Sequence, residues 1–302
     1  MYSGVIFLLL FSCVTSPKSP DPFQDESVFL PLEPGASAYL LVDVPGVRPV
    51  IDQIGIPGMS GIQAKEILDR TWSAAAAFFP EGNERRFQAA AWGKYPEFGG
   101  RLALAAGKDW KRERSKTGGT YYHSAKDGLS VALNASQAFA SGAGPGSAGD
   151  PFAAAPGTEA PEGFAEFRRG AVLALWLTDP APPANRFFAA LGIPLQLPAE
   201  QLFVSLLPHV PEGEGTGGGA EYEALIRIQT PAAGQARALL ALINMARVYA
   251  PETGEADGPA ALAAALFANP PVQDGRNLNL RTAAMDPAEI ALLFSVFSIY
   301  SD

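Results

Sequence analysis

Two stretches of this chain, far apart in sequence, share the same series of landmarks. Residues 37–57 and 170–194 each contain an apolar run, a proline-containing turn, a short amphipathic segment and the triplet Gly-Ile-Pro. Further along, 78–96 and 209–231 each carry Pro-Glu-Gly, a polar loop and a strand-like segment that ends in proline. Ordered landmarks at a nearly constant offset indicate an internal repeat. The chain is therefore predicted to contain two tandem copies of one unit.

The order of elements within one copy predicts the fold class. Strands are expected at 38–44, 72–79 and 86–94 in the first copy, and at 171–178, 202–208 and 221–229 in the second. Helical patterns follow at 97–107 and at 232–249. This is the β-α-β-β-α-β order of the ferredoxin-like arrangement. We therefore expect an α+β protein of two tandem duplicated ferredoxin-like units, packed together so that strands apolar on both sides are covered.

Two segments without a core-forming pattern set the expected domain boundaries. Residues 141–165 consist largely of Gly, Ala and Pro and are predicted to be a linker between a first unit at 36–140 and a second at 166–302. Residues 13–35 are rich in Ser, Pro and charge, and are predicted to be a flexible tether.

Composition limits the classes of partner. The net charge of the 302 residues is −9, which argues against nucleic acid as a partner because binding to it needs a basic surface. The same charge argues against simple electrostatic attachment to an anionic bilayer. Hydrophobic residues make up 48% of the chain, so a substantial core is possible. One cysteine excludes an internal disulfide.

The single cysteine follows a short apolar run. Residues 5–11 are too few to span a bilayer, which takes about 20 apolar residues, but they suit the core of a signal peptide. Leu10, Ser12 and Cys13 match the cleavage site of bacterial lipoproteins, and the stretch resembles a signal peptide of that family. Phe11 departs from the usual small residue, as is known from the looser sites of spirochaetal lipoproteins.

The resemblance implies an anchor and a location. Residues 1–12 would be removed as a signal peptide, and Cys13 would carry a diacylglycerol and a third acyl chain on its amino group. Several chains hold a protein firmly on a bilayer, since each buried methylene contributes about 0.8 kcal/mol. The expected location is the bacterial cell envelope, with the outer membrane favoured over the inner. One alternative is that Cys13 is a buried residue of an N-terminal helix. The first four residues carry no Lys or Arg, so either the true start lies upstream or the prediction of export is wrong.

The sequence contains no recognisable pattern of catalytic residues. His123 and His209 are interpreted as ordinary sheet residues, and Asp43 and Asp179 as helix caps rather than catalytic carboxylates. Motifs for zinc, calcium, a serine nucleophile or a phosphate loop are absent from the sequence. The basic cluster 108–116 is interpreted as a solvated helix end. We therefore expect no enzyme, no catalytic residue, no metal and no cofactor.

The C-terminal segment predicts a helix over 287–300. Asp286 and Glu289 have the spacing of a capping box, and the residues that follow are apolar on every side. We expect a core helix that buries Leu293 and Phe297. A segment that dips into a membrane or fits the groove of a partner is the alternative.

Two functions are compatible with these features. The leading hypothesis is a lipid-anchored, non-catalytic binding or structural module whose partner is an envelope protein or a hydrophobic ligand. The alternative is a membrane-active lipoprotein that inserts amphipathic helices into a leaflet, which resembles what is described for some treponemal outer-membrane lipoproteins. An envelope enzyme ranks third.

Overall fold

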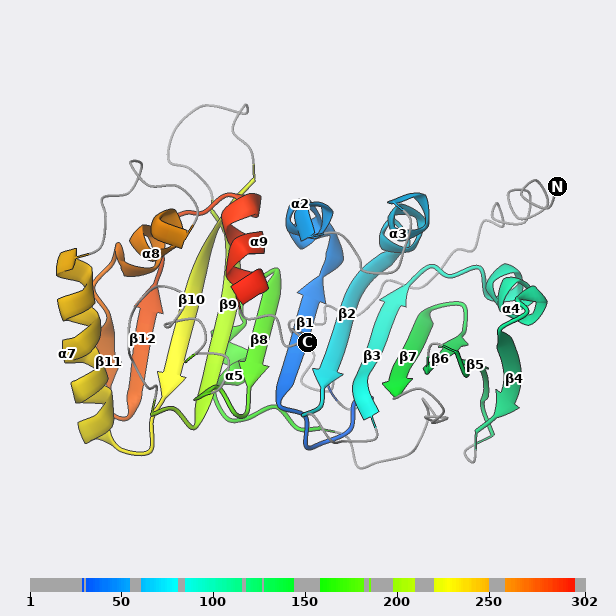
Figure 1. Cartoon of the computed structure of the whole chain (residues 1–302), viewed down its shortest axis with the longest axis horizontal. Helices are drawn as coiled ribbons and strands as arrows, with labels where there is room; N and C mark the ends of the chain where they lie inside the picture. Colours follow the sequence, from blue (N-terminus) through cyan, green and yellow to red (C-terminus); the bar gives the residue numbers. More distant parts are fainter. Residues whose placement is uncertain are drawn as a thin grey trace. The chain divides into compact units, whose positions relative to one another are not determined.

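The structure is a computed structural model, and its chain divides into two compact units. Unit 1 comprises Met1–Pro45 and Met59–Ala165, and unit 2 comprises Gly46–Gly58 and Glu166–Asp302 (Figure 1). The residues described are 29, 31–54, 61–80, 85–115, 118–126, 128–143, 158–181, 185, 198–209, 220–249 and 259–296. Both units combine helices with antiparallel strands, so the α+β class is confirmed.

The described residues of unit 1 form seven strands in the order β1-β2-β3-β7-β6-β5-β4. Their bounds are Ala38–Asp43 for β1, Thr71–Phe78 for β2, Arg85–Gly93 for β3, Trp110–Arg114 for β4, Thr120–Ser124 for β5, Leu129–Leu133 for β6 and Gln137–Ala143 for β7. All pairs are antiparallel. Helix α3 (Gly61–Leu68) precedes β2, and α4 (Glu97–Ala106) connects β3 to β4.

Small side chains dominate the middle of this sheet. Strand β2 buries every second residue, as a strand with one face on a core should, and Ala75 in it pairs with Ala90 of β3. On the next strand, Gly142 of β7 lies opposite Phe87, and a Cβ atom at Gly142 would come within 2.2 Å of the Phe87 ring. A glycine is needed here because the ring occupies the space of a side chain.

The core of unit 1 includes residues from both segments that the sequence predicted to be unpacked. Phe29 lies in the predicted tether, is fully buried, and has its ring 5.8 Å from those of Tyr39 and Phe164. Thr158 lies in the predicted linker, is buried, and donates its hydroxyl to the carbonyl oxygen of Leu32 at 3.1 Å. The predictions of an unpacked tether and linker are therefore wrong at these positions, because aromatic and hydroxyl side chains there complete a core. Residues 13–28 and 144–157 lie outside the described part of the chain.

In the described part of unit 2 there are five strands, in the order β8-β9-β10-β12-β11. Their bounds are Leu173–Leu177 for β8, Gln201–His209 for β9, Glu221–Gln229 for β10, Val272–Asp274 for β11 and Asn277–Arg281 for β12. Its helices are α7 (Ala233–Tyr249), α8 (Pro259–Phe267), α9 (Pro287–Val296) and the part of α2 (Val44–Ile54) from Gly46 onward. The short α5 (Phe164–Phe167) spans the point along the chain where unit 1 ends.

Burial in unit 2 follows the apolar pattern of its strands. All five residues of β8 are buried, as the sequence predicted for a strand apolar on both sides. Strand β10 alternates instead and buries Tyr222, Ala224 and Ile228. The Tyr222 hydroxyl donates to the carbonyl oxygen of Gly46 at 2.9 Å, which ties α2 to this strand.

The ferredoxin-like strand order is wrong. That order requires the strands on either side of the first helical connection to be parallel, with another strand between them. Here β1 and β2 are direct antiparallel neighbours. Two helices, α2 and α3, connect them, so the chain returns to the end at which β1 finished. Strands β8, β9 and β10 repeat the neighbour order of β1, β2 and β3, which agrees with a duplication, but the internal repeat stays a prediction.

Candidate functional site

The predicted lipid-attachment residue, Cys13, and the signal peptide at 1–12 lie outside the described residues. The Gly-Ile-Pro triplets at 55–57 and 192–194 lie outside them too. These predictions stand on the sequence alone.

Both histidines hold strands together. Nδ1 of His123 is 3.1 Å from the hydroxyl of Ser130, and both residues are buried between β5 and β6. Nδ1 of His209 lies 2.9 Å from a carboxylate oxygen of Glu223, and the other oxygen of that carboxylate accepts from Arg281. Each histidine is tied to a neighbouring strand of its own sheet.

The two candidate aspartates and the basic cluster lie at or next to strands. Asp43 ends β1 directly before α2, where a capping role was expected, and Asp179 follows β8. The basic cluster 108–116 is not a helix end, because Trp110–Arg114 forms β4, the edge strand of the unit 1 sheet. Charged side chains suit an exposed edge, since they discourage pairing with other chains. The helix that precedes this cluster ends at Ala106.

The capping box of the last helix is confirmed. The Asp286 carboxylate accepts from the backbone amides of Ala288 and Glu289, both at 2.8 Å. The Glu289 carboxylate accepts in return from the Asp286 amide at 2.9 Å. Ile290 and Leu293 are buried, as expected for a core helix. Phe297 lies outside the described residues.

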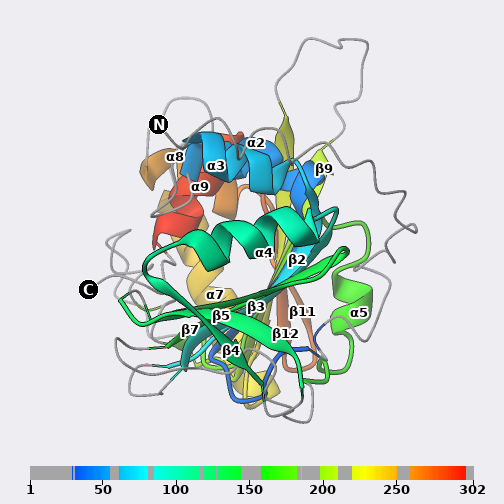
Figure 2. The same ribbon diagram turned by 90° about the vertical axis from the view of Figure 1, so that its right-hand side faces the viewer.

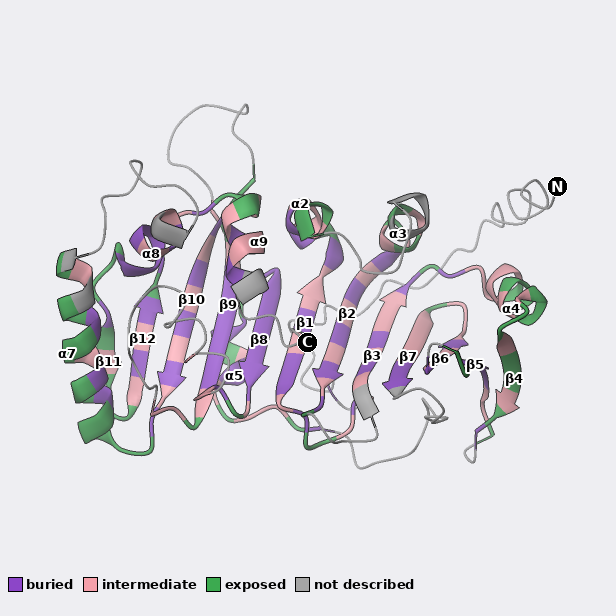
Figure 3. Cartoon of the chain, viewed as in Figure 1, coloured by how far each residue is buried: buried purple, intermediate pink, exposed green. Residues whose placement is uncertain are grey.

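Helix α4 presents apolar side chains to solvent. None of the residues of this helix, which lies toward the viewer in Figure 2, is buried, and Figure 3 draws it in the colours of intermediate and exposed residues. Phe98 and Leu102 are 73% and 46% exposed. These two residues lie one turn apart, so they form a stripe on one side of the helix. A polar contact attaches the helix to the sheet, since the guanidinium of Arg101 donates to the carbonyl oxygen of Leu133 at 3.1 and 3.3 Å. The apolar stripe of α4 is therefore available to a partner or a bilayer.

Helix α7 of unit 2 carries a second apolar stripe. Its inner side buries Leu239 and Ile243. On its other side, Leu242, Met245 and Val248 are exposed, the last two by 55% and 79%. A helix that is apolar on two sides has more apolar surface than its own unit covers.

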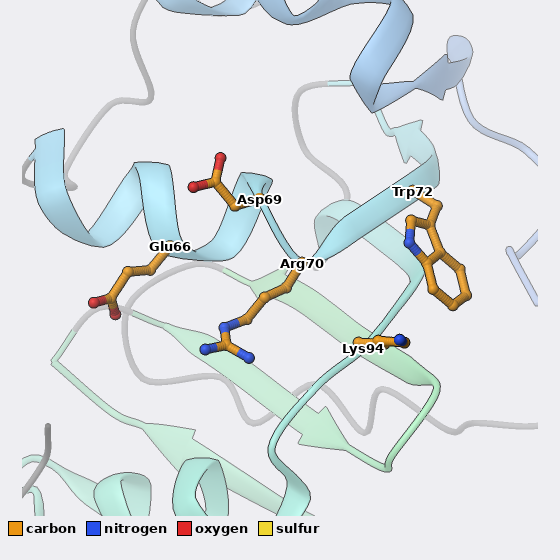
Figure 4. A pocket seen from close by; sticks show the side chains of 5 residues that line it. All are labelled: Glu66, Asp69, Arg70, Trp72 and Lys94. Carbon is orange, nitrogen blue, oxygen red and sulfur yellow. The ribbon is translucent and has the colours of Figure 1, made fainter. Parts of the chain in front are cut away.

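One charged pocket lies in unit 1, where α3 meets the start of β2 and the end of β3. Its volume is about 340 Å³, and its lining consists of Glu66, Asp69, Arg70, Trp72 and Lys94 (Figure 4). The lining thus combines two acidic side chains, two basic side chains and one indole ring. Such a lining suits a polar ligand that carries charge of both signs.

The backbone that carries the pocket residues is closely paired. The amide of Lys94 donates to the carbonyl oxygen of Arg70 at 2.8 Å. Next to these two residues along the chain, the buried hydroxyls of Thr71 and Tyr95 lie 3.0 Å apart, and burial raises the pKa of Tyr95 above 10.0. A Cβ atom at Gly93 would lie 2.1 Å from the Arg70 carbonyl oxygen, so only glycine permits this approach.

The described residues contain no group of three or more His, Cys, Asp or Glu side chains that could hold a metal ion. Among the helices of the same residues, none combines the length and the apolar character needed to cross a bilayer.

Comparison with known families gives one match. Residues 25–143 match the family model of the outer membrane-associated lipoprotein TP0453. This stretch begins in the predicted tether and continues through β7 of unit 1. The match supports a lipoprotein of the bacterial cell envelope, with the outer membrane favoured, as the sequence predicted. No curated protein matches the chain.

Solved structures of TP0453 show the same fold. Its crystal form III has a TM-score of 0.59 at 18% sequence identity, with 88% of this chain and 97% of that chain covered. Crystal form I gives the same TM-score and identity, with coverages of 93% and 99%. At this identity the likeness concerns the fold alone.

The sequence did not indicate the pocket or the exposed stripes. Arg70 and Lys94 are 24 residues apart, and only the antiparallel order of β2 and β3 brings them together. A signal for the stripe of α4 was available, since Phe98, Leu102 and Ala105 recur at helical spacing. That spacing is equally typical of a helix packed on a core, and only the structure shows the stripe exposed.

Proposed function

We propose that this chain is a lipid-anchored protein of the bacterial outer membrane, held through acyl chains on Cys13. Two independent observations support the proposal. Leu10, Ser12 and Cys13 have the spacing of a lipoprotein cleavage site. Residues 25–143, which do not include that site, match the model of an outer membrane-associated lipoprotein. The second observation carries the proposal, because it does not depend on the signal peptide.

Within the envelope, the proposed role is that of a non-catalytic binding or structural module. The contacts of the two histidines support it: His123 bonds to Ser130 and His209 to Glu223, so the side chains best suited to proton transfer bridge strands instead. The partner is proposed to be an envelope protein or a hydrophobic ligand.

Replacement of the cysteine tests the anchor. Cys13→Ser is expected to abolish incorporation of labelled palmitate in cells and to move the protein from the detergent-rich to the aqueous phase in a detergent partition. Ser16→Ala, three residues away, is the control and should keep both properties. A Cys13→Ser protein that still partitions with detergent as the wild type does would contradict the proposed anchor.

The exposed apolar stripes favour a second function, a membrane-active lipoprotein that inserts amphipathic helices into a leaflet. On α4 the stripe consists of Phe98 and Leu102, and on α7 of Leu242, Met245 and Val248. An apolar helix face that lies in the interface of a bilayer is stabilised in proportion to the apolar area it buries. The proposed anchor would keep these helices close to such an interface.

Vesicle flotation separates the two functions. The non-acylated Cys13→Ser chain should bind vesicles of neutral phospholipid if the stripes insert. Adding Phe98→Ser and Leu102→Ser should then weaken binding severalfold. Val272→Ser is the control, because Val272 is an exposed apolar residue of strand β11 rather than of a helix. Absence of flotation by the non-acylated chain would reject the membrane-active function and leave the binding or structural module.

A further inference from the structure

The pocket between α3, β2 and β3 contains two cationic side chains, Arg70 and Lys94. Among the residues that the structure describes, neither Arg70 nor Lys94 has an ion-pair partner. The nearest acidic neighbour in sequence, Asp69, is bound to Lys65 at 2.7 Å, so its charge is already compensated. Like charges held close together repel each other, and an anion placed between them removes that repulsion.

The frame around these cations is fixed before any ligand arrives. The hydrogen bond from the Lys94 amide to the Arg70 carbonyl oxygen joins the two residues through their backbones. The backbone at Gly93 also packs so closely on the same carbonyl that a Cβ atom would not fit there. A preformed arrangement of charges lowers the entropy cost of binding, because only the side-chain ends must be ordered.

The far end of the pocket has the opposite charge. Figure 4 shows Arg70 between Glu66 on one side and Lys94 on the other. Among the described residues Glu66 also lacks an ion-pair partner, so its carboxylate can accept hydrogen bonds from a ligand. Trp72 lies at the other end, beside Lys94, so it does not contribute to the acidic end. The pocket is thus polarised along its length.

We propose that this pocket binds a small zwitterion with a phosphate group at one end and a primary ammonium group at the other. The phosphate lies between Arg70 and Lys94, and the ammonium donates to Glu66. A phosphate is preferred over a carboxylate because it has enough oxygens for the guanidinium fork and the lysine ammonium together. A carboxylate has two oxygens, and a bidentate guanidinium engages both.

Calorimetric titration of the full chain in neutral, phosphate-free detergent micelles tests the proposal. The probes are O-phosphoethanolamine, inorganic phosphate and 4-aminobutyrate, which replaces the phosphate by a carboxylate. O-phosphoethanolamine should bind most tightly. Arg70→Gln and Lys94→Gln should each weaken it about tenfold or more, the usual effect of losing a charge-assisted hydrogen bond. Glu66→Gln should weaken O-phosphoethanolamine and leave inorganic phosphate unchanged.

Lys126→Gln is the control, since Lys126 is an exposed cation of unit 1 outside the pocket and the variant has the same change in net charge. It should bind as the wild type does, and all variants should melt at the wild-type temperature. Equal losses in Lys126→Gln and Lys94→Gln, no binding of O-phosphoethanolamine at millimolar concentration, or equal binding of 4-aminobutyrate would each overturn the proposal.

A fourth probe identifies the source of the ligand. Glycerophosphoethanolamine is a phosphodiester, like the headgroup of a phospholipid, whereas O-phosphoethanolamine is a free monoester. Tighter binding of the diester would assign the pocket to a lipid headgroup, and tighter binding of the monoester to a soluble metabolite. Both results support the zwitterion site. Neither binding result depends on the anchor at Cys13 or on the apolar stripes. The experiments can therefore contradict the proposed function without contradicting this site, and the reverse.

Discussion

The hydroxyl of Tyr95 lies 3.0 Å from that of Thr71, and both side chains are buried under the charged pocket. Thr71 donates its own hydrogen to the carbonyl oxygen of Ile67 at 2.8 Å, so Tyr95 is the donor in the pair. This chain of two hydrogen bonds joins the end of α3, the start of β2 and the segment after β3.

Tyr95→Phe should lower the free energy of unfolding by about 0.5–1.5 kcal/mol, the usual net contribution of such a hydrogen bond. Urea denaturation at pH 7 measures it. Thr71→Val is the companion variant and should cost at least as much, because it also leaves the carbonyl oxygen of Ile67 without this donor. Two variants as stable as the wild type would show that the pair is not formed in solution.

The pair also predicts a loss of stability at alkaline pH. Burial raises the pKa of Tyr95 above 10.0, so the folded state favours the neutral phenol. Its contribution is complete below pH 10 and is lost as the pH rises through the folded-state pKa. The free energy of unfolding should therefore fall between pH 9 and pH 12, and fall less in Tyr95→Phe. Burial also raises the pKa of Tyr222, which accounts for part of the remaining loss. If the free energy of unfolding falls equally steeply with pH in the wild type and in Tyr95→Phe, the assignment to Tyr95 is contradicted.

Gly93→Ala should be strongly destabilising. The new methyl group would meet the backbone carbonyl of Arg70, which cannot rotate away as a side chain could. We expect a cost of about 1–3 kcal/mol, as for other overpacked sites. Gly234→Ala is the matched control, because it places a methyl in open space within α7 and should be neutral or stabilising by up to about 1 kcal/mol. Thermal melting of both variants measures the difference, and equal melting temperatures would contradict the close approach at Gly93.

Leu293→Ala tests whether α9 is a core helix. Leu293 is 3% exposed, so the change should cost about 2–5 kcal/mol through lost burial and the cavity left behind. Leu242→Ala makes the same chemical change on the exposed stripe of α7 and should cost less than about 0.5 kcal/mol. Chemical denaturation of both variants measures the costs. Similar values would mean that Leu293 is not packed in a core.

Asp286→Ala should remove the cap of the same helix. Two backbone amides lose their acceptor, and the expected cost is about 0.5–2 kcal/mol. Asp274→Ala in β11 is the control for loss of one carboxylate. Thermal melting near neutral pH distinguishes them, and an unchanged melting temperature for Asp286→Ala would contradict the cap.

Local features of this protein could be predicted from its sequence. The strand predicted at 38–44 is observed at Ala38–Asp43, and that predicted at 221–229 at Glu221–Gln229. The cap of α9 was read from the spacing of Asp286 and Glu289 alone. Hydrophobic period and cap chemistry act over a few residues, so the sequence expresses them directly.

One local prediction failed for a reason that is not local. The cluster at 108–116 has the composition of a solvated helix end, yet Trp110–Arg114 pairs with β5 as an edge strand. Exposed charges are compatible with either structure. This segment is a strand because the backbone groups of the neighbouring strand β5 supply its hydrogen bonds.

Pairing order and packing were decided by the tertiary structure. Local sequence does not say whether β2 runs parallel or antiparallel to β1, because that depends on the path of the helices between them. Phe29 and Thr158 stand in segments of low apolar content, and each is buried because distant residues complete its surroundings. Arg70 and Lys94 meet for the same reason. Sequence determines which residues prefer a strand, a helix or a cap, whereas contacts between distant residues form only once the whole chain has folded, and they alone create the pocket.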